Sequence, residues 1–385
     1  MTVDDDLRAT SDRDPIGRPR LLASVLVVAA VVAVAVVAVT VIRPEVVRLD
    51  PASGIGGEPA VGPQAVPSTT GSPAQTTLGL VEEVWPEAVV TVPRKLDDGT
   101  VLEGLLFADR GTVVLRSRID LERTAAFYAY DLAAKRFRKI TDVNEPEERF
   151  SGGYAMAGDR LVWWVNEAGY TNGEVWAAPF SGGPPVRLAQ SPRGAFGRIQ
   201  LVGDRLIYSL QGGDVLSVPV EGGTVSPVPG GQGLTLLEWP WAGTPSDVSG
   251  EDKFLFRHLV DLETGATADA VVGPGELYVQ CGVTVCTGSR EQQSFVRNRD
   301  GSDERPIPGL GLAPAADRFL HLKEGTGRLI DLRTGKVADL GVVIPEYTGE
   351  AHEELLVEVT TRDVIAYQRG QELVFIDLRR IIAGS

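Results

Sequence analysis

The chain has 385 residues and a formal net charge of −15 at pH 7, with 52 acidic against 37 basic residues. A protein that binds nucleic acid needs a patch of Lys and Arg to neutralise phosphates. We therefore expect no nucleic-acid partner. The length exceeds that of a typical single domain, so several domains or one large β architecture must account for it.

Residues 21–42 form one apolar run, LLASVLVVAAVVAVAVVAVTVI, without charge, Pro or Gly. As a helix rising about 1.5 Å per residue, the run is about 33 Å long, enough to cross a hydrocarbon core of about 30 Å. We predict a transmembrane helix over 21–42. The alternative is a cleaved signal peptide, for which Ala33-Val34-Ala35 offers small residues. Because signal-peptide cores usually run about 7 to 15 residues, the length favours a retained signal-anchor.

The basic residues around this segment predict its orientation. Four arginines precede it and two follow it closely: Arg8, Arg13, Arg18 and Arg20, then Arg43 and Arg48. The flank richer in Lys and Arg normally stays in the cytoplasm. Residues 1–20 are therefore expected to form a cytoplasmic tail. The remainder is expected to lie on the extracytoplasmic side of the cell membrane, after a single pass.

Residues 43–79 are rich in Pro, Gly, Ser, Thr and Ala, and carry almost no aromatic or periodic apolar content. Such a composition cannot bury enough surface to offset chain entropy. We predict a disordered linker, kept extended by its prolines, between the membrane and the folded part. Residues 80–385 then form one large domain.

A turn-and-strand pattern repeats within this domain. Gly158-Asp159-Arg160 and Gly203-Asp204-Arg205 each open a strongly apolar strand. A second strand and a Gly-Gly turn follow in both cases, at Gly182-Gly183 and Gly222-Gly223. Two successive hairpins thus share one pattern, and the repeat is about 40 residues long, the length of a four-stranded propeller blade.

A second turn consists of an apolar residue followed by Asp-Leu. It occurs at Tyr130-Asp131-Leu132, Val260-Asp261-Leu262, Ile330-Asp331-Leu332 and Ile376-Asp377-Leu378. The Asp carboxylate can accept backbone N–H groups just downstream, and Gly265 and Gly335 supply the left-handed conformation that closes a bulged turn. Together with the turns near residues 180, 220 and 300, the chain has seven such turns. We predict an all-β, seven-bladed β-propeller, with six and eight blades as alternatives.

The two ends of the domain predict how the ring closes. The turn at Asp377 leaves little room for a further outer strand before the C-terminus. An early strand at residues 88–92 precedes the first blade and lacks a hairpin partner. We expect this strand to complete the last blade, because closure by both chain ends removes exposed sheet edges.

The hairpins ending Pro179-Phe180-Ser181-Gly182-Gly183 and Pro219-Val220-Glu221-Gly222-Gly223 resemble repeats of the TolB-like and WD40-like propellers of bacterial envelopes. The resemblance covers most of residues 100–380 and is carried by turn chemistry. It implies a fold and no particular activity. Arg also outnumbers Lys strongly, which is typical of GC-rich, for example actinobacterial, genomes.

Cys281 and Cys286 are the only cysteines of the chain. They flank the short segment Gly-Val-Thr-Val, in which Gly282 permits a tight turn. On the extracytoplasmic side, an oxidising compartment, a disulfide is expected. A redox or metal site would require Cys-x-x-Cys or a nearby His, and the sequence has neither.

Recognisable catalytic and metal-binding patterns are missing from the sequence. The three histidines, His258, His321 and His352, lack metal-ligand spacing. No Gly-x-Ser-x-Gly elbow occurs. We therefore expect no catalytic, cofactor or metal residues, and no enzyme. Trp239 and Trp241 are the candidate partner-binding residues, because Pro240 bars a central strand and leaves both aromatic rings near a loop.

These observations favour a non-catalytic binding or scaffold propeller, tethered to the membrane and facing a protein or another envelope component. One alternative is a sensor whose tail passes a signal to a cytoplasmic regulator such as an extracytoplasmic-function sigma factor. The other is a glycan-acting envelope enzyme whose site is assembled from residues far apart in sequence.

Overall fold

The computed structural model describes residues 78–120, 123–244, 256–309, 314–322, 327–342, 358–361 and 363–384. All of them belong to the compact unit Pro73–Ser385. The predicted cytoplasmic tail, the predicted transmembrane helix and nearly all of the predicted linker lie outside these residues. Among the helices that the structure does describe, none has both the length and the apolar character that a membrane crossing requires.

The described residues form seven antiparallel sheets, numbered here as blades 1 to 7 in chain order. Blade 1 contains β2 (Leu102–Phe107), β3 (Thr112–Arg118), β4 (Thr124–Asp131) and β5 (Arg136–Asp142). Blade 2 contains β6 (Arg149–Ala157), β7 (Arg160–Glu167), β8 (Gly173–Pro179) and β9 (Val186–Ser191). Blade 3 contains β10 (Ala195–Val202), β11 (Arg205–Leu210), β12 (Val215–Pro219) and β13 (Ser226–Pro227).

Blade 4 contains β14 (Thr235–Glu238), β15 (Trp241–Gly243), β16 (His258–Asp261) and β17 (Thr267–Asp269). Blade 5 contains β18 (Glu276–Cys281), β19 (Val285–Arg290), β20 (Gln293–Asn298) and β21 (Arg305–Ile307). Blade 6 contains β22 (Phe319–Leu322), β23 (Arg328–Asp331) and β24 (Val337–Asp339). Blade 7 contains β25 (Glu358–Thr361), β26 (Val364–Arg369), β27 (Glu372–Asp377) and β1 (Val89–Pro93). Two short helices, α1 (Val81–Val84) and α2 (Leu378–Ala383), and the 3-10 turn η2 (Ala168–Tyr170) complete the fold.

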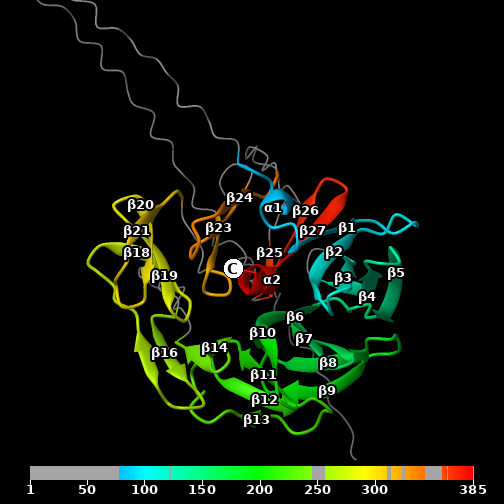
Figure 1. Cartoon of the computed structure of the whole chain (residues 1–385). Helices are drawn as coiled ribbons and strands as arrows, with labels where there is room; N and C mark the ends of the chain where they lie inside the picture. The colour runs from blue at the N-terminus through cyan, green and yellow to red at the C-terminus, as the bar shows by residue number, and fades with distance from the viewer. Residues whose placement is uncertain are drawn as a thin grey trace, which may run out of the picture. The chain divides into compact units, whose positions relative to one another are not determined.

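The blades follow one another around a ring, which confirms the predicted seven-bladed propeller (Figure 1). The ring closes through β1, whose residue Val89 pairs with Ile376 of β27 in an antiparallel register. The prediction that the strand at residues 88–92 completes the last blade is therefore confirmed. After β27 the chain forms α2, and Asp377 caps this helix by accepting the N–H of Arg379.

One backbone hydrogen bond recurs in every blade and explains the sequence repeat. The residue that follows β4, β8, β12, β16, β20, β23 or β27 donates its N–H to the carbonyl of the residue that precedes the preceding strand. The seven pairs are Leu132 to Gly111, Phe180 to Asp159, Val220 to Asp204, Leu262 to Pro240, Arg299 to Thr284, Leu332 to Arg318 and Leu378 to Asp363, at 2.7 to 2.9 Å. The repeated turn thus lies at the corresponding end of every blade.

The Asp-containing turns have the predicted chemistry. One Asp131 oxygen accepts the N–H groups of Ala133 and Ala134 at 2.9 and 2.8 Å. Asp261 does the same for the next residues of blade 4, where Gly265 adopts a φ of +73°. A side-chain acceptor and a left-handed glycine together satisfy the backbone groups that the turn exposes.

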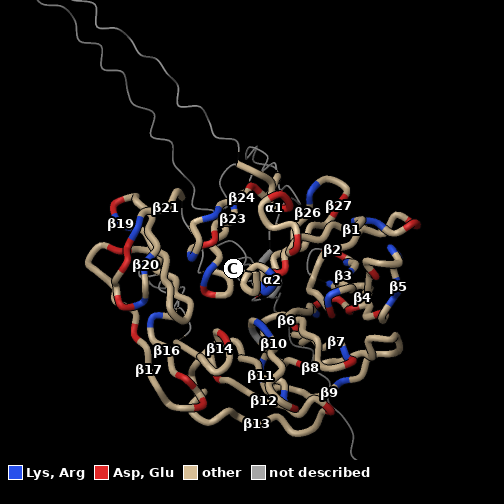
Figure 2. The backbone as a smooth tube through the Cα atoms, viewed as in Figure 1, with Lys and Arg blue, Asp and Glu red and all other residues tan. Residues whose placement is uncertain are grey.

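The hydrophobic core lies between neighbouring blades. Phe127 of blade 1 and Trp163 of blade 2 are both fully buried, and their ring centroids lie 4.8 Å apart. Similar apolar clusters join blades 2 and 3 around Tyr208, and blades 7 and 1 around Phe375. Each such burial stabilises the fold by about 1.5 to 3 kcal/mol. Acidic and basic residues are intermixed along the blades of the described part (Figure 2).

Candidate functional site

Cys281 and Cys286 are a directly paired couple on β18 and β19, with Sγ atoms 2.01 Å apart. Both side chains are fully buried against blade 5's apolar cluster. This geometry agrees with the predicted disulfide.

The turn closed by the disulfide contacts both neighbouring blades. Arg299, after β20, donates from Nε to the Val283 carbonyl at 3.0 Å and from Nη1 to the Phe256 carbonyl of blade 4 at 2.9 Å. Asp317, before β22 of blade 6, accepts the N–H of Thr284 at 2.7 Å and also its hydroxyl. The turn is therefore the junction of three successive blades.

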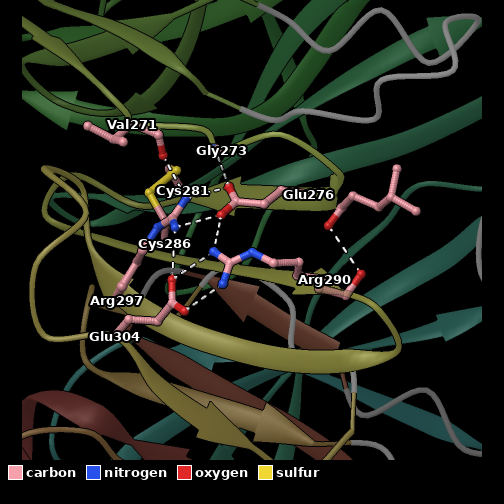
Figure 3. A network of polar contacts seen from close by, with 10 residues as sticks. Val271, Gly273, Glu276, Cys281, Cys286, Arg290, Arg297 and Glu304 are labelled. Carbon is pink, nitrogen blue, oxygen red and sulfur yellow. Dashed lines mark hydrogen bonds and ion pairs between the residues drawn. A yellow bond between two sulfur atoms is a disulfide. The ribbon is translucent and has the colours of Figure 1, made fainter.

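A buried charge network lies on the same blade as the disulfide (Figure 3). The Glu276 carboxylate has no exposed side-chain surface and receives two guanidinium bonds from Arg297, at 2.6 and 2.8 Å. Arg290 and the N–H of Gly273 donate to it as well. Glu304 then accepts from both arginines, at 2.9 Å from Arg297 and 3.1 Å from Arg290. Two carboxylates and two guanidinium groups therefore neutralise each other.

The charge state of Glu276 follows from this arrangement. Burial alone would raise its pKa, but the bonds from Arg297, Arg290 and Gly273 outweigh burial and lower the pKa to about 2. The carboxylate is thus ionised at any physiological pH. Arg297 is buried as well, with 4% of its side chain exposed, and its bonds to Glu276 and Glu304 hold it in place.

A cleft of about 670 Å³ opens between blades 5 and 6, and four arginines line it: Arg297, Arg305, Arg318 and Arg333. Two of them are neutralised inside the fold, Arg297 by the network above and Arg318 by a bidentate pair with Asp331 at 2.6 and 2.7 Å. The other two differ, because both are exposed and neither forms an ion pair with any described residue. Among the described residues, the Arg305 guanidinium donates to the Leu332 carbonyl, across the cleft, at 2.7 Å.

Acidic groups also line the cleft. Asp317 is occupied by the blade 5 turn, and Asp303 accepts from the side-chain amide of Asn298 at 2.9 Å. Glu304 also lines the cleft and is paired with Arg290 and Arg297. The cleft therefore places two guanidinium groups without an ion pair beside carboxylates that already accept bonds from the protein. Such a surface suits a ligand that carries an anionic group for Arg and hydroxyl groups for Asp and Asn.

The tryptophans predicted to bind a partner lie in blade 4, away from this cleft. Trp239 and Pro240 form the turn between β14 and β15, joined by a cis peptide bond, and Trp241 begins β15. Trp239 is half-buried, its backbone N–H donates to Gln200, and its indole N–H donates to Glu263. Trp241 is also partly buried. Neither ring lines the cleft between blades 5 and 6. Their role in partner binding stays a prediction.

Within the described residues, no group of three or more His, Cys, Asp and Glu side chains converges as metal ligands would. The sequence analysis missed Arg305 and Arg333, the residues that define the cleft. These two residues come from neighbouring blades, and the blade repeat is the only feature of the sequence that bears on their positions. Arg333 follows the Asp-Leu turn of blade 6, and the structure places it in one cleft with Arg305 of blade 5.

Comparisons with known proteins identify no family. No family model matches the chain, so the resemblance to TolB-like and WD40-like propellers is supported only as far as the seven-bladed propeller fold. No curated protein matches it either.

Solved structures with low sequence identity to this chain are similar to it in fold. An oligogalacturonate lyase of Vibrio parahaemolyticus shares 8% identity over 75% of this chain and 97% of its own, with a TM-score of 0.45. An oligogalacturonate lyase in complex with manganese shares 11% identity over 72% of this chain and 77% of its own, with a TM-score of 0.33. A chain of the mitotic checkpoint complex shares 11% identity over 84% of this chain and 98% of its own, with a TM-score of 0.43.

These likenesses concern the fold, and they assign no activity, ligand or metal to this chain. They do require one correction. We expected the chain not to be an enzyme because catalytic motifs are missing. That inference is wrong, since two of these three similar structures are oligogalacturonate lyases.

Proposed function

We propose that the chain is a membrane-tethered β-propeller that acts on the extracytoplasmic side and binds an anionic, hydroxylated ligand in the cleft between blades 5 and 6. The observation that carries the ligand class is the pair Arg305 and Arg333. Both guanidinium groups lie in the cleft, exposed, without an ion-pair partner among the described residues. Asp303, Glu304 and Asp317 line the same cleft and form no ion pair with these two arginines.

Two features support the proposed location. The apolar run at residues 21–42 is long enough to span a bilayer. The only two cysteines lie at disulfide distance, an arrangement typical of oxidising compartments. A passage of signal through residues 1–20 to a cytoplasmic regulator remains a second hypothesis for the tail.

The location is tested by fusing alkaline phosphatase, or a fluorescent protein that matures only in the cytoplasm, after Ser385. We expect phosphatase activity and no fluorescence in intact cells. The opposite pattern would contradict the proposed topology.

The ligand class is tested by calorimetric titration of the full-length protein in detergent micelles. The probe is a hexuronate oligosaccharide, which carries one carboxylate and several hydroxyl groups per sugar, and its matched control is an uncharged oligosaccharide of equal length. We expect the charged probe to bind at least about tenfold more tightly, equivalent to about 1.4 kcal/mol. Equal affinity, or no binding of the charged probe, would contradict the proposal. The incubated samples are also analysed for cleaved products, because this fold can support catalysis.

A further inference from the structure

Glu145 is a buried carboxyl group in residues 143–148, the segment that connects β5 of blade 1 with β6 of blade 2. Only 3% of the residue is exposed. Its Oε2 accepts the N–H of Thr124 at 2.7 Å, while its own N–H donates to the Thr124 carbonyl at 3.2 Å. These reciprocal bonds tie the connecting segment to the first residue of β4.

The other carboxyl oxygen of Glu145, Oε1, is buried and has no hydrogen-bond partner among the described residues. An unmet polar atom in the interior destabilises the fold, and does so more strongly when the group is charged. Burial raises the pKa of Glu145 to about 7, although the Thr124 amide, the nearby Ser151 hydroxyl, Arg116 and Arg149 all favour the ionised form. The group is therefore close to half-protonated at neutral pH.

The cationic groups that face Glu145 have other partners. Arg116 of β3 donates to Glu103 at 3.0 Å, and Arg149 of β6 pairs with Glu174 at 3.0 Å. Each guanidinium group is thus already matched by another carboxylate. Ionised Glu145 consequently has no counter-ion of its own.

A line of hydroxyl groups runs from this carboxyl towards Arg116. Thr124 Oγ1 and Ser151 Oγ lie 2.8 Å apart, and Ser151 Oγ lies 3.1 Å from the Tyr154 phenol oxygen. That oxygen accepts a bond from Arg116 at 2.6 Å. The connecting segment packs against this line through Glu145.

The segment itself is strained on both sides of Glu145. Asn144 and Glu148 adopt φ values of +47° and +71°, in the left-handed region that side chains other than Gly occupy at a cost. Glu147 and Glu148, the other acidic residues of the segment, are exposed. The segment is held against β4 by Glu145 and by the N–H groups of Val143 and Asn144, which donate to the Ala125 carbonyl at 2.8 and 3.0 Å, against the cost of these left-handed residues.

We propose that Glu145 is a proton-operated latch: its protonated carboxyl holds residues 143–148 against β4 and β6, and loss of the proton frees the segment. Release would uncover the hydroxyl line of Thr124, Ser151 and Tyr154 at the junction of blades 1 and 2. This latch is independent of the ligand cleft, so either proposal can fail while the other stands.

Hydrogen exchange of the full-length protein, read by mass spectrometry and corrected for the intrinsic pH dependence of exchange, tests the latch. Between pH 5.5 and pH 8.5, the opening of residues 143–148 should increase about 30-fold, since the carboxyl ionises near its ordinary pKa only in the open state. In Glu145→Gln the opening should not change with pH. Glu147→Gln, on the same segment but exposed, should retain the wild-type response.

If Glu145→Gln does not fold, hydrogen exchange of the wild-type protein is sufficient to test the latch. Opening of residues 143–148 that is constant from pH 5.5 to pH 8.5 would overturn the latch. So would a Glu145→Gln protein that keeps the wild-type response, because another group would then carry the proton.

Discussion

Two buried glutamates of this propeller have opposite charge states. Glu276 of blade 5 and Glu145 between blades 1 and 2 are each at most 3% exposed. Arg297, Arg290 and a backbone N–H donate to Glu276, and its pKa falls to about 2. Glu145 has a single backbone donor within hydrogen-bond distance, and its pKa rises to about 7. Burial penalises both, so the number and charge of the donors decides which carboxyl stays ionised.

The two sites therefore have opposite effects on the pH dependence of stability. The folded-state pKa of Glu276 is lowered, so its contribution is present above about pH 4.5 and lost as the pH falls towards 2. The folded-state pKa of Glu145 is raised, so its contribution is present below about pH 4.5 and lost as the pH rises to about 7. Variants that alter the donors should shift one site towards the behaviour of the other.

The largest effect is expected from Arg297→Met. This change removes both bonds from Arg297 to Glu276 and leaves the buried carboxylate with the partly exposed Arg290 and the N–H of Gly273. We expect the free energy of unfolding at pH 7 to fall by about 3 to 5 kcal/mol, measured by urea denaturation. Arg136→Met, an exposed arginine of β5, should change it by less than about 0.5 kcal/mol. A loss of less than about 1 kcal/mol for Arg297→Met would show that this charge network contributes little to the stability of the fold.

A gain of stability is expected from Glu145→Gln. At pH 8.5 the amide avoids the cost of ionising a buried group, and the free energy of unfolding should rise by up to about 3 kcal/mol. At pH 4.5 the gain should nearly vanish, because the wild-type carboxyl is then protonated when folded. Denaturation curves at both pH values measure the difference. The same gain at both would mean that the proton of Glu145 is not involved.

The smallest effect is expected from Asp317→Asn, at the junction of blades 5 and 6. The amide keeps one acceptor oxygen and loses the charge that binds the Thr284 N–H and hydroxyl. We expect a loss of about 1 to 2 kcal/mol in the free energy of unfolding. An unchanged value would indicate that the blade 5 turn is held by the disulfide and Arg299 alone.

Local chemistry made much of the fold predictable. The Asp-Leu turns and the Gly-Asp-Arg turns each fix their own backbone within a few residues, and their repetition indicated the number of blades. The strand at residues 88–92 could be assigned to the last blade because the chain after Asp377 was too short for an outer strand. The same local reasoning predicted the pairing of Cys281 with Cys286.

The cleft and the latch could not be predicted in this way. Arg305 and Arg333 are 28 positions apart, and they share a cleft only because blades 5 and 6 stack. Glu145 lies in the acidic stretch Glu145-Pro146-Glu147-Glu148, where nothing distinguishes the one buried residue from its exposed neighbours. Its environment is set by Thr124 and Ser151 of two different blades, and that depends on tertiary packing.

The central functional claim is that Arg305 and Arg333 bind the anionic group of a ligand. Charge reversal of both residues, Arg305→Glu with Arg333→Glu, tests it most directly, with the hexuronate oligosaccharide as the probe and Arg136→Glu as the matched control. We predict that the double variant loses at least about 100-fold in affinity, since two guanidinium contacts of about 1.4 kcal/mol or more are replaced by repulsion. The control should bind as the wild type does. Unchanged affinity in the double variant would contradict the assignment of the cleft.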